Sequence, residues 1–144
     1  MTLIDKLNEK SNSVESNQKE VIKEIKEYFN NIFQSKKFED YIEKWADINK
    51  KQMSFTVEFW KHQDGCGNTY FRVGGFKWEL EKDYYHRYNT QYKEVDLVDI
   101  QNKVCEELYY LLSDKMRELG FTHLSTVNEE NCFPWYDKKV TYRW

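Results

Sequence analysis

A chain of 144 residues that is 40% hydrophobic and 33% charged is typical of one soluble globular domain, which we place at residues 1–144. The net charge of −3 argues against a non-specific binder of nucleic acid, and no run of eighteen apolar residues indicates a membrane span. Three cysteines and an N-terminus without the apolar run of a signal peptide predict a cytoplasmic protein without disulfides.

The first third of the chain is predicted to be mostly helical. Residues 1–12 are polar with a small apolar cluster, and we expect a frayed lead-in or a short docking helix there. From Ser13 onward the apolar residues recur with the helical period, and Ser13, Ser16 or Asn17 would cap that helix. A second helical stripe follows the sequence QSKK and places Trp45 in the core or at its edge. Two consecutive helices, or one kinked helix, are therefore expected.

The next segment changes to the period of a strand. Residues 53–59 alternate apolar and polar side chains, which predicts a half-buried strand. A glycine-containing loop over residues 62–68 separates it from a second strand that starts at Thr69. After Gly74 and Gly75 the apolar residues move from odd to even positions. We interpret this change as a β-bulge, because one extra residue at a glycine pair shifts the alternation.

The sequence DYYHRYNTQY, residues 83–92, is unusually rich in rings. It holds four tyrosines, a histidine and an arginine, and its aromatic and polar side chains alternate. The same spacing also fits a helix, but tyrosine and threonine favour strands and the segment is short. A third strand is therefore predicted over residues 84–92.

A long helix and two short strands complete the predicted elements. Asp96 is expected to cap the helix, Gly120 to end it, and Phe121 to make the apolar contact that often follows such an end. Strands are expected near residues 121–127 and 135–144. The order α-α-β-β-β-α-β-β has no alternating β-α units. It predicts an α+β fold in which an antiparallel sheet of about five strands has helices packed on one face.

Catalytic and metal-binding signals are weak. His62 and Cys66 fall in a predicted turn with His86 one strand away, so these three are candidate zinc ligands, or a cysteine nucleophile with a histidine base. Their spacing matches no known zinc module, and neither a metal nor another cofactor is predicted. Cys105 lies on the apolar face of the long helix and is expected to pack in the core.

Aromatic residues give the more informative signal. Tyrosine and tryptophan supply rigid amphipathic contact area, which is why recognition surfaces concentrate them. If helices cover only one face of the sheet, rings on the other face are candidates for an interaction surface. The candidate partner-binding residues are Tyr84, Tyr85, His86, Arg87, Tyr88, Tyr92, Trp60, Trp135 and Trp144.

These observations favour a small non-enzymatic protein-binding module of the inhibitor or immunity type, such as bacteria, phages and mobile elements encode. Residues 79–131 hold twelve acidic and six basic side chains, so an acidic, Tyr/Trp-rich face would occlude the functional surface of a larger enzyme. A homodimer is a further alternative. A single-stranded nucleic-acid binder that stacks bases on the tyrosine face is the second interpretation, and an enzyme centred on His62, Cys66 and His86 the third. No motif indicates a family.

Overall fold

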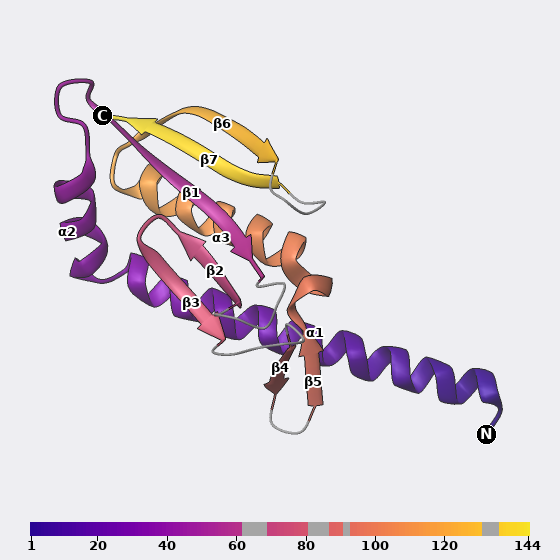
Figure 1. The fold of residues 1–144 in the computed structure, drawn as a ribbon. Coiled ribbons are helices and arrows are strands. Elements are labelled where there is room, and N and C mark those ends of the chain that lie inside the picture. Colours follow the sequence, from indigo (N-terminus) through magenta and orange to yellow (C-terminus); the bar gives the residue numbers. More distant parts are fainter. Residues whose placement is uncertain (62–68, 81–86, 91–92, 131–135) are drawn as a thin grey trace.

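A computed structural model of the chain describes residues 1–61, 69–80, 87–90, 93–130 and 136–144, and Figure 1 shows their arrangement. The helices in these ranges are α1 (Leu3–Phe33), α2 (Lys36–Trp45) and α3 (Leu97–Glu118). The strands are β1 (Gln52–Trp60), β2 (Thr69–Val73), β3 (Phe76–Leu80), β4 (Arg87–Thr90), β5 (Lys93–Asp96), β6 (Thr122–Glu130) and β7 (Tyr136–Arg143).

Five strands form one antiparallel sheet in the order β3-β2-β1-β7-β6. The central strand β1 pairs with β2 on one side, where Val57 lies opposite Val73, and with β7 on the other, where Phe55 lies opposite Val140. All four of these side chains are buried, and their neighbours along each strand face the opposite side of the sheet. One face of the sheet is therefore apolar.

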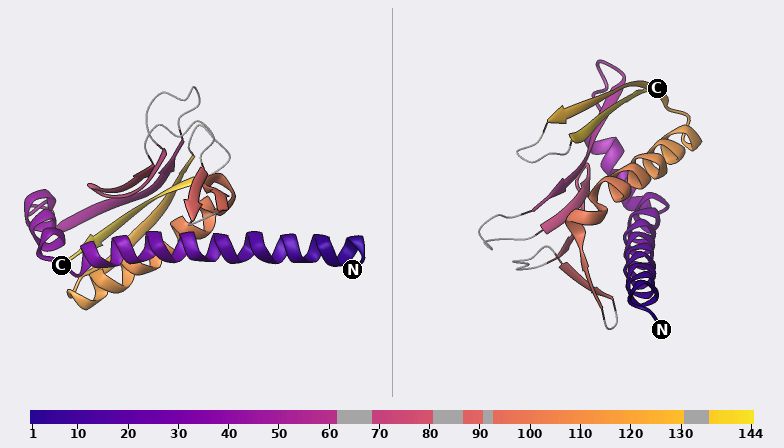
Figure 2. Two further views of the ribbon diagram at one scale, coloured as in Figure 1. Left: turned by 90° about the horizontal axis from the view of Figure 1, so that it is seen from below. Right: turned by 90° about the vertical axis from the view of Figure 1, so that its right-hand side faces the viewer.

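Helices α1 and α3 pack against each other on that apolar face, and both views in Figure 2 show them on the same side of the sheet. The core between the helices and the sheet combines side chains at helical spacing with side chains at strand spacing. Its helical members are Val21, Ile25, Phe29 and Phe33 of α1, Phe38 and Ile42 of α2, and Leu97, Ile100, Val104, Leu108, Leu112 and Met116 of α3. The predicted α+β fold, an antiparallel five-stranded sheet with helices on one face, is confirmed.

Helix α1 begins ten residues earlier than the sequence suggested. The Thr2 hydroxyl accepts the N–H of Asp5, and the Asp5 carboxylate accepts the N–H of Thr2, both at 3.1 Å. This reciprocal pair satisfies two N–H groups at the start of the helix. Residues 1–12, which we call the N-terminal arm, are thus helical from Leu3 onward, and the expected caps at Ser13, Ser16 and Asn17 are wrong.

The expected β-bulge at Gly74 and Gly75 is also wrong. These residues form a two-residue turn between β2 and β3, in which Val73 pairs with Phe76 and Gly74 has a φ of +58°. Residues that pair across such a turn face the same side of the sheet. The apolar positions therefore change from odd to even, which is also the signature of a bulge.

The third predicted strand does not join the main sheet. Its central part is β4, which pairs with β5 in a separate two-stranded ribbon, with Tyr88 opposite Val95. The ribbon lies beside α1 (Figure 1), which it contacts. Residues 84–86, 91 and 92 of the predicted strand lie outside the described residues.

The ends of α3 follow the prediction closely. The Asp96 side chain accepts the N–H of Val98 at 3.0 Å and caps the helix. At the other end the N–H of Phe121 bonds to the carbonyl of Met116 at 2.9 Å, and Gly120 has a φ of +93°. This is the expected glycine-terminated helix end.

Trp45 departs from its prediction. It is the last residue of α2, and 61% of its surface is exposed, so it does not belong to the core. Its ring lies 6.3 Å from that of Tyr41, and the Lys44 ammonium lies 5.3 Å from the ring centre.

No helix in the described part of the chain is both long and apolar enough to cross a membrane.

Candidate protein-binding site

Most residues predicted to bind a partner cannot be placed. Tyr84, Tyr85, His86, Tyr92 and Trp135 lie outside the described residues, as do the metal candidates His62 and Cys66. For two further candidates, Arg87 and Tyr88, the structure gives the position in β4 only. Trp60 and Trp144 are the two candidates whose surroundings are described.

Trp60 lies on the face of the sheet opposite the helices, where it pairs with Tyr70 of β2. It is partly buried, and the neighbouring positions carry charge. Arg72 forms an ion pair with Glu58, and the Arg72 guanidinium lies 5.7 Å from the centre of the Tyr70 ring. Burial and then the Glu58 carboxylate raise the pKa of Tyr70 above its ordinary value. Trp60 therefore borders a charged patch of the sheet.

Trp144 lies beside a hollow in which aromatic side chains gather. Its ring meets that of Phe121 edge to face, with the ring centres 5.7 Å apart. The hollow has a volume of about 320 Å³ and lies between α3 and the two C-terminal strands, β6 and β7. We call it the aromatic hollow, and its residues are Tyr109, Tyr110, Ser113, Arg117, Phe121, His123 and Tyr142.

Buried residues form the base of the aromatic hollow. Tyr142 is only 2% exposed, and its hydroxyl lies 3.2 Å from that of Ser113 on α3. Burial raises the pKa of Tyr142, although its bond to Ser113 acts in the opposite direction. Tyr142 therefore keeps its proton at neutral pH. The base of the hollow presents neutral hydroxyl groups and ring surface.

Hydrogen bonds also fix the wall of the hollow. Thr126 of β6 lies within hydrogen-bonding distance of two ring groups, the Tyr109 hydroxyl at 3.0 Å and Nε2 of His123 at 2.7 Å. The His123 ring meets Tyr142 edge to face at 5.9 Å. These groups come from α3, β6 and β7, and hydrogen bonds and strand pairing hold them in place.

Exposed side chains form the rim. Tyr110 is 53% exposed and Trp144 is 45% exposed, although large rings are usually buried more fully. Arg117 supplies the one cationic group among the lining residues and pairs with Asp114 at 3.1 Å. Exposed tyrosine, tryptophan and arginine around a preformed hollow are the residue types that dominate binding energy at protein interfaces.

Sequence reasoning found Trp144 but missed the rest of the hollow. Tyr109, Phe121 and Tyr142 are separated by up to 33 positions in the chain: Tyr109 lies on α3, Phe121 between α3 and β6, and Tyr142 on β7. Tyr142 alternates correctly within its strand, but no local pattern shows that it faces the C-terminal half of α3. Tyr110 was the one further signal of this surface in the sequence. It falls outside the apolar stripe of the predicted helix, so its ring would be expected to face away from the core.

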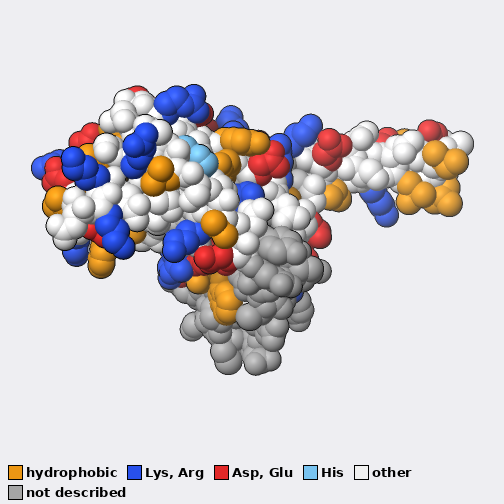
Figure 3. All heavy atoms as spheres, turned by 90° about the horizontal axis from the view of Figure 1, so that it is seen from above, with side chains coloured by type: hydrophobic (Ala, Val, Ile, Leu, Met, Phe, Trp, Pro, Cys, Tyr) orange, Lys and Arg blue, Asp and Glu red, His pale blue; other side chains and the backbone are white. Residues whose placement is uncertain are grey.

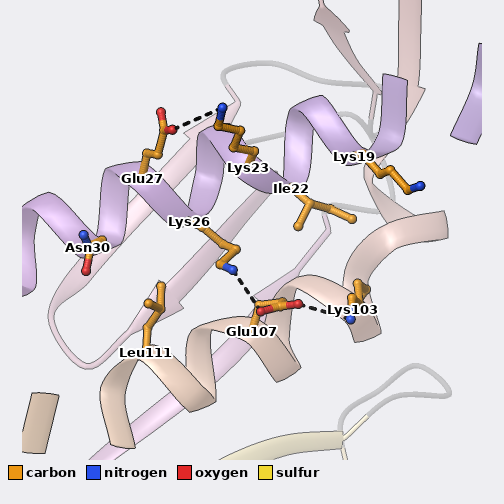
Figure 4. Close-up of a pocket in the computed structure, with 9 residues that line it drawn as sticks. All are labelled: Lys19, Ile22, Lys23, Lys26, Glu27, Asn30, Lys103, Glu107 and Leu111. Atoms are coloured by element: carbon orange, nitrogen blue, oxygen red, sulfur yellow. Dashed lines mark ion pairs between the residues drawn. The ribbon is translucent and has the colours of Figure 1, made fainter. Parts of the chain in front are cut away.

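A second hollow lies between α1 and α3 (Figure 4) and has a volume of about 470 Å³. Its residues are Lys19, Ile22, Lys23, Lys26, Glu27, Asn30, Lys103, Glu107 and Leu111. Figure 4 shows Lys26 and Lys103 pointing at the Glu107 carboxylate, which they contact at 3.0 and 3.1 Å. The other two lysines also face carboxylates, at 3.4 and 3.9 Å. Only the Lys26–Glu107 pair joins the two helices, and the other three pairs lie within one helix. Because every lysine here already faces a carboxylate, the aromatic hollow is the better candidate site.

Within the described ranges, no three histidine, cysteine or acidic side chains lie together in a way that could hold a metal ion. Cys105 packs against the core as predicted, and burial raises the pKa of its thiol to about 12. A thiol with so high a pKa is a poor nucleophile at neutral pH.

The chain was compared with known families, curated proteins and solved structures. No protein-family model, no curated protein and no solved structure matches it.

Proposed function

We propose that this chain is a protein-binding module without catalytic activity, of the inhibitor or immunity type, and that the aromatic hollow is the centre of its binding surface. In this proposal the partner is a larger enzyme, and binding covers a functional surface of that enzyme. The aromatic hollow and the exposed rings at its rim are the observation that supports it.

The size and lining of the hollow indicate what it would receive. A volume of about 320 Å³ is at the lower end of small-molecule sites and suits one or two anchoring side chains of a partner. An apolar or aromatic anchor would contact the rings of Tyr109, Phe121 and Tyr142. An acceptor group on the partner would complete the hydrogen bonding of Arg117 at the rim.

The wall is held in place before any partner arrives. Tyr142 and Thr126 belong to the sheet, and their hydroxyls bond to side chains that the sheet and α3 hold. Little side-chain freedom would then be lost on binding, and this raises affinity for a given contact area. Tyr110 and Trp144 are the exposed members, and truncating them removes contact area without disturbing the core.

The test uses affinity capture followed by measured binding. The wild-type chain would be used to capture partners from the lysate of its host, with and without nuclease, and the captured protein would be identified and purified. Tyr110→Ala and Trp144→Ala would then be compared with Trp45→Ala, which truncates a more exposed tryptophan that does not line the hollow. We expect the first two variants to weaken binding by roughly tenfold or more each and the control to leave it unchanged.

Other results would contradict the proposal. If capture depends on nucleic acid, or if binding falls steeply with salt and no protein remains after nuclease treatment, the chain is a nucleic-acid binder. If a protein partner binds Tyr110→Ala and Trp144→Ala as tightly as the wild type, the hollow is not its binding site.

A further inference from the structure

The N-terminal arm projects from the rest of the molecule. In Figures 1 and 2 the first part of α1 runs beyond the sheet and the other helices, and every residue from 1 to 12 is exposed. The arm nevertheless carries large apolar side chains: Leu3 is 70% exposed, Ile4 68% and Leu7 52%. Figure 3 shows hydrophobic side chains gathered at its end. Such a group of exposed apolar side chains normally marks an interaction surface.

The exposed apolar row continues the buried face of the same helix. Leu7, Val14 and Val21 follow one another at intervals of seven residues, which is two turns, so they lie on one face. Val21 of α1 is fully buried in the core, whereas Val14 is 55% exposed and Leu7 is about half exposed. One apolar stripe therefore runs the length of α1, and the sheet and α3 cover only its C-terminal part.

We propose that a second copy of this chain covers the rest of the stripe, through antiparallel pairing of two N-terminal arms. The direction follows from the position of the core. From Val21 onward the apolar face of α1 is occupied by its own sheet and α3, so two parallel helices that shared this face would bring both bodies to the same place. Antiparallel arms place the bodies at opposite ends of the pair.

The charges of the arm favour its own copy over a strongly charged partner. The arm carries two acids, Asp5 and Glu9, and two bases, Lys6 and Lys10, so it has no side-chain charge excess to direct a partner of opposite sign. Antiparallel helices also align their dipoles favourably. Most helical stability in proteins comes from packing of an apolar face, so a partner that covered the apolar side chains of the arm would stabilise its helix.

The test compares two glutamates on opposite sides of α1. Leu7→Glu places a charge in the centre of the apolar stripe at an already exposed position, and glutamate is a good helix former. Ser16→Glu is the matched control. Ser16 follows Leu7 by nine residues, or two and a half helical turns, so it is exposed on the opposite side of α1. The masses of all three proteins would be measured by analytical ultracentrifugation between about 1 and 100 μM.

We expect the wild type and Ser16→Glu to dimerise in that range and Leu7→Glu to raise the dimer dissociation constant by roughly 100-fold, because each dimer loses two buried leucines. Amide hydrogen exchange in residues 3–14 should slow as the wild-type concentration rises, and should stay fast in Leu7→Glu. Small-angle X-ray scattering should give an elongated dimer with the two bodies well apart.

A wild type that remains monomeric up to about 100 μM overturns the proposal, and a different protein must then cover the stripe. A dimer that Leu7→Glu leaves intact overturns it too, because the copies then meet elsewhere. A compact dimer with adjacent bodies overturns the antiparallel arrangement.

Discussion

The ring of Tyr41 on α2 lies directly against the backbone of Gly75 in the β2–β3 turn. A Cβ atom at position 75 would stand 2.6 Å from Cε2 of Tyr41. The ring cannot move away freely, because Phe76 and Phe55 flank it with ring centres at 5.0 and 6.0 Å. Packing against Tyr41 is therefore the reason for glycine at position 75. At the adjacent position 74, the φ of +58° is an additional reason for glycine. The turn and the short helix α2 hold each other in place.

Gly75→Ala should therefore destabilise the protein by about 1–3 kcal/mol, which is typical of an overpacked contact. Urea denaturation would give the value. Gly120→Ala is the contrasting variant, since nothing lies within 4 Å of a Cβ there and only its φ of +93° opposes the change. A Tyr41→Ala background should remove most of the cost at position 75 and none at position 120. An equal cost in both backgrounds at position 75 would contradict the contact.

Glu107→Gln should weaken the joint between α1 and α3. The Glu107 carboxylate accepts Lys26 and Lys103, and these bonds hold its pKa below the usual range. Because the groups are partly exposed, the expected loss of stability at pH 7 is only about 0.5–1 kcal/mol. A lowered pKa in the folded state means that this stability is present above the unfolded value of about 4.3 and is lost as the pH falls below it.

The wild type and Glu107→Gln should consequently converge in stability as the pH falls through the lowered pKa of Glu107. Urea titrations at a series of pH values would show this convergence. Glu106→Gln is the neighbouring control, because Glu106 takes part in neither of these two ion pairs. A difference between wild type and Glu107→Gln that does not shrink as acid protonates Glu107 would show that the ion pairs are not its cause.

The Cys105 thiol should resist alkylation in the folded protein. Its pKa of about 12 leaves almost no thiolate at pH 8, and the side chain packs against the core. Iodoacetamide should modify it only after unfolding, as peptide mapping by mass spectrometry would show. Rapid modification of the native protein would contradict this environment.

The raised pKa of the thiol also has a consequence for alkaline stability. The folded state favours the protonated thiol, so this contribution is complete below the unfolded pKa of about 8.5 and is lost as the pH rises toward 12. Tyr142, whose pKa is also raised by burial, acts in the same direction at higher pH. Cys105→Ala should therefore lose less stability than the wild type between about pH 9 and pH 11, measured by urea denaturation.

The start of the N-terminal arm depends on one reciprocal pair of hydrogen bonds. Thr2→Ala should reduce the helical circular dichroism signal at 222 nm, because the N–H of Asp5 loses its acceptor. The pKa of Asp5 is lowered by its bonds to Thr2, so the wild-type signal should also fall as acid protonates that carboxylate. Asn12→Ala, in the middle of the same helix, should leave the signal unchanged or raise it.

Local patterns predicted the elements that have strong local signals. Asp96, Gly120 and Phe121 marked both ends of α3, since capping depends on neighbouring residues alone. Residues 53–59 likewise showed their alternation within one strand. The start of α1 was missed because the polar sequence NEKSNS hides the seven-residue spacing of Leu7, Val14 and Val21.

Other features depend on contacts between distant segments, which a single sequence does not reveal. Gly74 and Gly75 fit a bulge and a turn equally well until Tyr41 is seen beside them. Trp45 follows the helical period of α2 but stands at its last residue, beyond the reach of the core. The aromatic hollow combines α3, β6 and β7, so only Trp144 was singled out beforehand.

The position of β7 has a consequence for how the protein forms during synthesis. This strand, residues 136–143, is inserted between β1 and β6, and both of these strands lose a neighbour without it. A ribosome that has released only the first 130 residues has therefore supplied the helices of the core but not the strand that joins β1 to β6. Until β7 emerges, the backbone N–H and C=O groups along one edge of β1 have no strand to pair with.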